Sequence, residues 1–311
     1  MRIEFKAKKL FERIPVDEHL KMYYEMVMMS FVDQVSERID TSKLAAIIVP
    51  EDFRTEVMTF QKSIGERPSL TKNEYAEAFS KLLYDKSQDT YYVFLESCIA
   101  QYIIGDKFVA VFAKGEDTDT FLDRRSVALT MLTHEMAHAS IYERIWGNDE
   151  VKKESLLRYL STILFDEYCA CRISNSLVTG SANASNQVQI CELEELIEHA
   201  RGRFGNNEIN INQFADILFQ HTELILKYMV SYVGAQHGRG AQDIDYTDGY
   251  IAKITPIFAR KLNRLFDNLE AGRTLDFGVI SDVIQLYFDT MGIKMVENKS
   301  GFALGINDRE T

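Results

Sequence analysis

The chain has 311 residues, of which 46% are apolar and 26% are charged. These proportions are ordinary for a globular protein, and they exclude an intrinsically disordered chain, a collagen-like chain and a coiled-coil fibre. The net charge of −12 argues against nucleic acid as the main partner, because phosphate binding needs a basic footprint.

The first 180 residues predict short strands that alternate with helices. Apolar and β-branched runs predict strands, and apolar residues at helical spacing predict helices. The expected strands are residues 3–5, 45–49, 91–95 and 108–112. The expected helices are residues 16–38, 51–63 and 72–84, a long helix between Thr120 and Gly147, and another from about 148 to 176. At the start of the long helix, Thr120 with Asp123 forms a weak capping-box pattern, and Gly147 is a stop signal.

A small, polar stretch at residues 179–186 predicts a domain boundary. The remainder predicts helices at residues 188–203, 211–233, 251–269 and 277–291, with a long glycine-rich loop at 234–249. We therefore expect a predominantly helical α+β protein with two domains, residues 1–178 and 187–311.

The sequence also bears on the compartment. Four cysteines are too few for a disulfide scaffold. The N-terminal residues lack the apolar run of a signal peptide, and no window approaches the roughly 20 apolar residues of a membrane span. These features predict a cytoplasmic protein with reduced thiols and no membrane partner.

The strongest motif is His-Glu-Met-Ala-His at residues 134–138, inside the long predicted helix. On a helix His134 and His138 share one face, so both imidazoles can reach one ion, while Glu135 lies beside the ion without being its ligand. This pattern predicts Zn²⁺ held by two histidines, with Glu135 as the base that deprotonates a water. With 6 histidines and 47 acidic residues, the spacing is expected by chance roughly 0.02 times. The alternative is a helix whose two histidines are satisfied by neighbouring polar groups.

A zinc enzyme needs a third protein ligand and leaves a fourth position to water. The metzincin extension is excluded, because it requires glycine at position 141 and histidine at position 144, where this chain has isoleucine and arginine. Glu167 falls on the apolar face of the next helix, where an unpaired carboxylate would be costly and a cation would resolve the conflict. The competing ligands are Asp166, which otherwise serves as an acceptor for a histidine N–H or as a surface charge, and His199, His221 or His237. The competing role for Glu167 is an ion pair with Arg158 or Arg172.

With these residues the chain resembles the gluzincin branch of the HExxH metallopeptidases, and Glu-x-x-Ala (Glu167 and Ala170) is similar to the minimal ImmA/IrrE-type members. The resemblance covers roughly residues 90–176. It implies a zincin-like domain, with a small sheet and an HExxH active-site helix, followed by a helical domain. It also implies that an edge strand beside the active-site helix binds the substrate backbone, and residues 91–95 or 108–112 are the candidates for that strand.

The expected function is zinc-dependent hydrolysis of peptide bonds in a peptide or protein substrate. His134, His138 and Glu167 would hold the metal, and Glu135 would be general base and then proton donor to the leaving amine. The alternatives are a regulatory protease that cuts one protein partner and a catalytically inactive zincin-fold binding protein. Zincins often add a donor that stabilises the oxyanion, and the candidates here are Tyr142, Tyr168, His199, His221 and His237.

Overall fold

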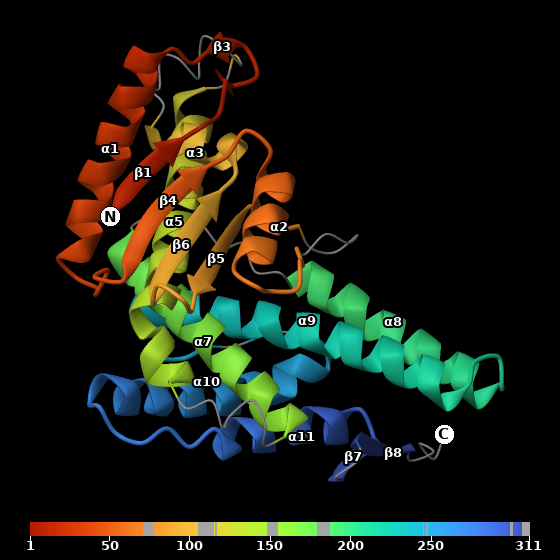
Figure 1. Ribbon diagram of the computed structural model, residues 1–311. Coiled ribbons are helices and arrows are strands. Elements are labelled where there is room, and N and C mark those ends of the chain that lie inside the picture. The colour runs from red at the N-terminus through yellow and green to blue at the C-terminus, as the bar shows by residue number, and fades with distance from the viewer. Residues whose placement is uncertain are drawn as a thin grey trace. The chain divides into compact units, whose positions relative to one another are not determined.

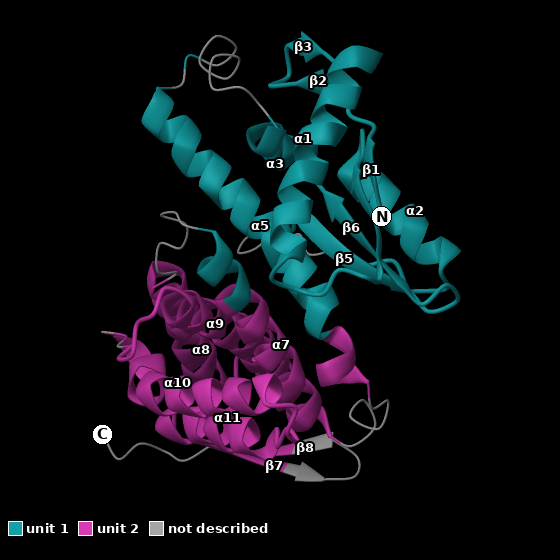
Figure 2. Cartoon of the chain, turned by 90° about the vertical axis from the view of Figure 1, so that its left-hand side faces the viewer, with its two compact units in different colours: residues 1–141, 173–182 teal, residues 142–172, 183–311 magenta. Residues whose placement is uncertain are grey.

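The computed structural model describes the chain except residues 71–76, 105–114, 116, 148–154, 179–186, 245, 247, 299–300 and 307–311. The described part is a mixed α/β structure that is mostly helical (Figure 1). It forms two compact units: residues 1–141 with 173–182, and residues 142–172 with 183–311 (Figure 2). In this division residues 142–172 belong to the second unit. The domain limits predicted from the sequence, 1–178 and 187–311, stay a prediction.

The first unit contains a four-stranded sheet in the order β1-β4-β6-β5. Its strands are β1 (Arg2–Phe5), β4 (Leu44–Val49), β6 (Thr90–Leu95) and β5 (Ser80–Asp85). The first three run parallel, and β5 pairs antiparallel with β6 at one edge. Strand β4 is buried along most of its length, as expected for a central parallel strand flanked on both sides.

Two helices of the first unit pack against this sheet. Helix α2 (Phe53–Ser63) contributes Phe53 and Val57 to a buried cluster with Ile48, Tyr92 and other strand residues. Helix α1 (Glu18–Ser36) places the ring of Tyr24 5.5 Å from that of Phe5 on β1. Burial of these large side chains is the main term that holds the layers together.

The predicted helix at residues 72–84 is wrong in its second half. Residues 80–85 form strand β5, in which Leu82 pairs with Val93 and Tyr84 with Tyr91. Pairing with the exposed edge of β6 outweighs the local helical pattern, because it satisfies a row of backbone groups and stacks the two tyrosine rings. Residues 71–76 lie outside the described residues, as does the predicted strand at 108–112. Helix α3 (Ser97–Ile104) and the short strands β2 (Lys9–Leu10) and β3 (Ile14–Pro15) were not predicted.

The long predicted helix is confirmed as α5 (Thr118–Trp146), which ends just before Gly147. Its expected cap is wrong. The carboxylate of Asp117 accepts bonds from the backbone N–H of Thr120 at 2.7 Å and from its hydroxyl at 2.9 Å. Thr120 therefore lies inside the first turn, and the Asp117 carboxylate satisfies its amide, which has no partner within the helix.

The second unit is built from helices. They are α7 (Leu156–Leu177), whose residues from 173 onward count with the first unit, α8 (Gln187–Gly205), α9 (Ile211–Gly238), α10 (Gly249–Glu270) and α11 (Gly278–Thr290), followed by the hairpin β7 (Ile293–Asn298) and β8 (Gly301–Ile306). The predicted helices are confirmed within a few residues, except that the predicted start of α7 near 148 and the boundary at 179–186 lie outside the described residues. The hairpin was not predicted.

The predicted loop at 234–249 is wrong at its start, because α9 continues to Gly238. Gly234 faces α7 so closely that a Cβ atom there would meet the carbonyl oxygen of Tyr168 at 2.5 Å. The glycine that suggested a loop is instead the residue that lets two helices approach.

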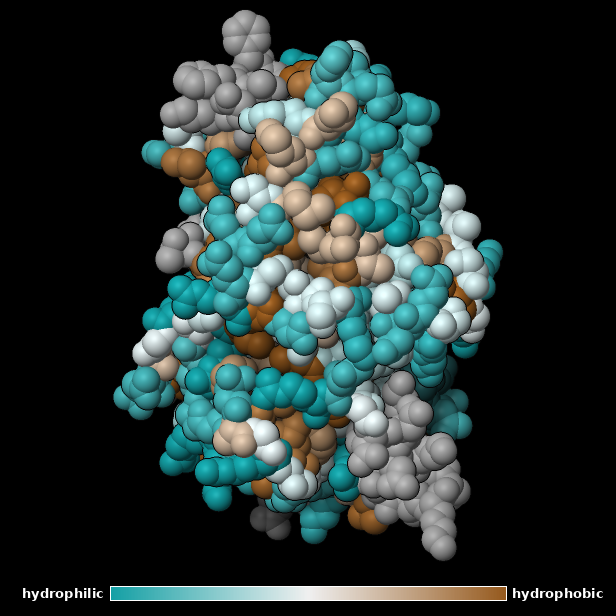
Figure 3. All heavy atoms as spheres, turned by 60° about the vertical axis from the view of Figure 1, so that its left-hand side comes forward, coloured by the Kyte–Doolittle hydropathy of each residue, from teal (hydrophilic) through white to brown (hydrophobic). Residues whose placement is uncertain are grey.

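Among the described residues, no helix combines the length and apolar character needed to cross a membrane. On the face drawn in Figure 3, hydrophilic residues surround smaller groups of apolar ones. The most exposed large apolar side chains include Met22 and Met26 on α1, at 67% and 63%. These two side chains lie one helical turn apart, and a folded protein normally exposes some apolar surface.

Candidate functional site

The two histidines of the motif face each other on α5. Their Nε2 atoms are 3.0 Å apart, and their rings lie edge to face with centroids 4.5 Å apart. Both side chains are half-buried. Their ring nitrogens thus converge on one point, as the spacing of one helical turn predicts.

The core side of α5 fixes this orientation. Leu132, Met136 and Ala137 are fully buried. Of the apolar residues near the histidines, Ile141 is also buried, whereas Val127 is 37% exposed. The buried side of α5 therefore runs through the motif, with Leu132 before it and Ile141 after it, and the histidines border that side.

The third predicted ligand, Glu167, joins this pair. One ligand atom each from His134, His138 and Glu167 lie within 4.8 Å of one another, and all three residues are half-buried. Within the described ranges this is the one group of three or more histidine, cysteine or carboxylate residues with such proximity.

The other residues considered as the third metal ligand lie outside this group, and three of them form hydrogen bonds with other residues. Asp166 accepts a hydrogen bond from the indole N–H of Trp146 at 2.9 Å. His237 contacts the hydroxyl of Tyr168 at 2.7 Å, and His221 contacts the carbonyl of Ile217 at 2.6 Å. His199 is exposed on α8. None of these side chains belongs to the group of three.

The donor set fits a zinc ion. In a tetrahedral site with Zn–N bonds of about 2.05 Å, two nitrogens are about 3.3 Å apart, close to the 3.0 Å between the two Nε2 atoms. The longest separation in the group, up to 4.8 Å, would need to shorten by at most about 1.5 Å, which small changes in side-chain torsions can supply. Two imidazoles and one carboxylate are also the ligands of a catalytic zinc site with one position open.

Glu135 lies on the buried side of the motif, with a side chain that is 9% exposed. Its Oε1 accepts a hydrogen bond from the hydroxyl of Ser80 at 2.7 Å. Ser80 is the first residue of β5, so the edge strand of the sheet contacts the predicted base. No sequence pattern indicated this serine, which is 55 residues away along the chain.

Glu167 contacts a second serine that no sequence pattern indicated. Its Oε1 accepts a bond from the hydroxyl of Ser231 on α9 at 3.0 Å, and the thiol of Cys171 lies at 3.7 Å. Arg172, one of the two predicted ion-pair partners, donates to the hydroxyl of Tyr168 at 2.8 Å and to Asn263 at 2.6 Å.

The structure does not identify one of the candidate residues as the donor that would stabilise the oxyanion. Tyr168 is fully buried, which raises the pKa of its hydroxyl, and it bonds to His237. Burial, and then the charge of Arg172, lower the pKa of His237 from 6.5 to about 4, so this histidine is neutral at pH 7. The ring of Tyr142 stacks on that of Trp146.

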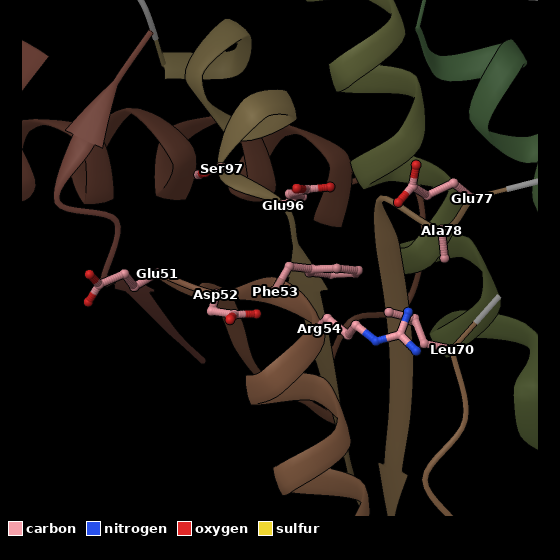
Figure 4. Close-up of a pocket in the computed structure, with 9 residues that line it drawn as sticks. All are labelled: Glu51, Asp52, Phe53, Arg54, Leu70, Glu77, Ala78, Glu96 and Ser97. Carbon is pink, nitrogen blue, oxygen red and sulfur yellow. The ribbon is translucent and has the colours of Figure 1, made fainter. Parts of the chain in front are cut away.

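A separate cavity of about 340 Å³ lies in the first unit, at the carboxyl ends of β4 and β6 (Figure 4). Several of its lining residues are acidic. Asp52 accepts from the backbone N–H of Thr55 at the start of α2, and Glu51 pairs with Lys8 at 2.8 Å. At least these two carboxylates therefore have structural partners.

Comparisons with protein-family models, curated proteins and solved structures return no match for this chain.

Proposed function

We propose that the protein is a zinc-dependent peptidase of the zincin type. His134, His138 and Glu167 are the metal ligands, and Glu135 is the general base. The observation that carries the proposal is the proximity of three ligand atoms within 4.8 Å, two of them from histidines that flank a buried glutamate on one helix.

The chemistry follows from these residues. A bound Zn²⁺ supplies a positive charge that lowers the pKa of water to about 7 and polarises a peptide carbonyl. Glu135 takes a proton from the attacking water and returns it to the leaving amine. Its burial keeps the carboxylate in a fixed place, and its bond to Ser80 restricts its rotation.

The sheet supports the proposal, but the strand predicted to bind the substrate has to be corrected. The predicted substrate strand, residues 91–95, is β6, which lies between β4 and β5 and has neighbours on both sides. Strand β5 is one of the two edge strands of the sheet, and it is the one whose first residue contacts Glu135. We therefore assign the binding of an extended peptide backbone to β5.

The test combines metal analysis with turnover. The purified protein should contain one zinc per chain, and it should cleave casein or a mixture of fluorogenic peptides in a reaction that a chelator stops. Glu135→Gln should keep the zinc and lose at least about 10²-fold in turnover. Glu143→Gln, at an exposed position two turns further along the same helix, is the matched control and should behave as the wild type.

The ligands are tested by loss of metal. His138→Ala should no longer retain zinc through dialysis. Stoichiometric zinc in that variant would mean that the metal lies elsewhere, and wild-type turnover in Glu135→Gln would remove the mechanism. A chain that takes up no zinc at all would overturn the proposal.

A further inference from the structure

The two carboxylates of the candidate site share one feature. Each accepts a hydrogen bond from a serine hydroxyl on another element: Glu135 from Ser80 at 2.7 Å, and Glu167 from Ser231 at 3.0 Å. We infer that these serines are positioning residues, Ser80 for the base and Ser231 for the third metal ligand. This inference rests on the proposed function.

Ser80 is well placed to hold the base. It is the first residue of β5, and its backbone position is set by the ladder with β6, where it pairs with Leu95. The bond holds Oε1 of Glu135 and so restricts the orientation of the carboxylate. Without it, the carboxylate gains freedom about its terminal torsion, and a base that is misplaced by about 1 Å transfers protons less efficiently.

Ser231 holds the ligand from within a packed helix. It lies on α9 one turn before Gly234, whose lack of a side chain brings α9 against α7. This close approach presents the hydroxyl to Oε1 of Glu167. Hydrogen bonds that orient a ligating side chain typically contribute 10- to 100-fold to metal affinity.

The two roles are separable because they act on different quantities. Loss of the bond to Glu167 weakens zinc binding, whereas loss of the bond to Glu135 slows turnover in protein that is loaded with zinc. A merely structural role for either serine would change stability and would not produce this division.

The experiment compares Ser80→Ala and Ser231→Ala with Ser80→Thr and Ser231→Thr, because threonine keeps the hydroxyl. Ser140→Ala is the matched control, since that hydroxyl bonds to the carbonyl of Ala137 in its own helix at 2.8 Å. Zinc affinity is measured by competition with a chromogenic chelator, kcat and KM are measured on a cleaved probe peptide, and folding is checked by circular dichroism.

Ser231→Ala should bind zinc about 10- to 100-fold more weakly, with Ser231→Thr within about threefold of the wild type. Ser80→Ala should keep its zinc affinity and its KM while kcat falls about tenfold, and Ser80→Thr should recover most of that loss. Equal zinc affinity in Ser231→Ala and the wild type would overturn the role of Ser231. An unchanged kcat in Ser80→Ala, or an equal loss in Ser80→Thr, would overturn the role of Ser80.

Failure of the proposed function would look different, because it would appear in the wild type. A wild-type protein that takes up no zinc overturns both the proposed function and this inference. Zinc uptake without cleavage of any probe overturns the peptidase and the role of Ser80, while the affinities of the two Ser231 variants still decide the role of Ser231.

Discussion

Gly234 sets the distance between α9 and α7, and replacing it with alanine tests that contact. A Cβ atom at this position would lie 2.5 Å from the carbonyl oxygen of Tyr168 and 2.9 Å from Cβ of Cys171. The first distance is about 0.5 Å shorter than 3.0 Å, and Cβ atoms essentially never come closer than 3.0 Å to another heavy atom. Because the carbonyl oxygen of Tyr168 is a backbone atom, it cannot rotate away as a side chain could.

The magnitude follows from two opposing terms. Alanine gains about 1 kcal/mol over glycine in helix propensity. Overpacking costs typically about 1–3 kcal/mol, and a backbone clash belongs at the upper end of that range. We therefore expect Gly234→Ala to lower the free energy of unfolding of the second unit by about 2 kcal/mol.

Gly202 on α8 is the matched control, because it is an exposed helical glycine with no atom within 4 Å of an added Cβ. Gly202→Ala should therefore raise stability by roughly 0.5–1 kcal/mol. Urea unfolding can be followed by the fluorescence of Trp146, the single tryptophan, which belongs to the same unit as both glycines. If Gly234→Ala were as stable as the wild type, the close approach of α9 to α7 would be refuted.

Three further predictions concern single side chains. Glu194→Ala should cost about 3 kcal/mol in unfolding free energy, because it removes the acceptor of three hydrogen bonds, two of them buried and one partly buried. The matched control is Glu195→Ala at the exposed neighbouring position, which should change the unfolding free energy by less than about 0.5 kcal/mol in the same urea titration. The pKa of His237 is about 4 in the folded protein, against an ordinary value of 6.5. As the pH drops from 6.5 towards 4, the unfolded chain therefore binds a proton at this histidine while the folded protein does not, and the free energy of unfolding should fall. His237→Gln, which keeps an acceptor for Tyr168, should lack part of that fall, and equal pH slopes in the two proteins would contradict the assignment. Asp117→Ala should cost about 1 kcal/mol and speed hydrogen exchange at the start of α5, where the amide of Thr120 loses its acceptor.

The helices could largely be predicted from the sequence, because their apolar residues recur at helical spacing and their ends carry local signals. Gly147 ended α5 as expected. The predictions were wrong where a contact with another part of the fold determines the secondary structure. Residues 80–85 become a strand because β6 has an edge to pair with, and Gly234 stays in α9 because a helix passes close to it. Neither partner can be read from a local window.

The candidate site divides in the same way. His134, Glu135 and His138 are visible in the sequence because four residues of helix bring them together. Glu167 could be proposed because a carboxylate on an apolar face needs an explanation. Ser80 and Ser231 could not, since they are 55 and 64 residues from the carboxylates they contact, and serine is common and carries no spacing signal.

Glu194 has a consequence for how the second unit opens. It lies on α8 and accepts hydrogen bonds from the amides of Tyr250 and Ile251, in the first turn of α10. First-turn amides usually fray and exchange with solvent quickly, because nothing in their own helix holds them. Here two of them are covered by a side chain from more than 50 residues away, so their deuterium uptake should be slow and should match the separation of α8 from α10. We therefore expect the start of α10 to open in the same cooperative event that separates α8 from α10, and the exchange of these two amides reports on that event.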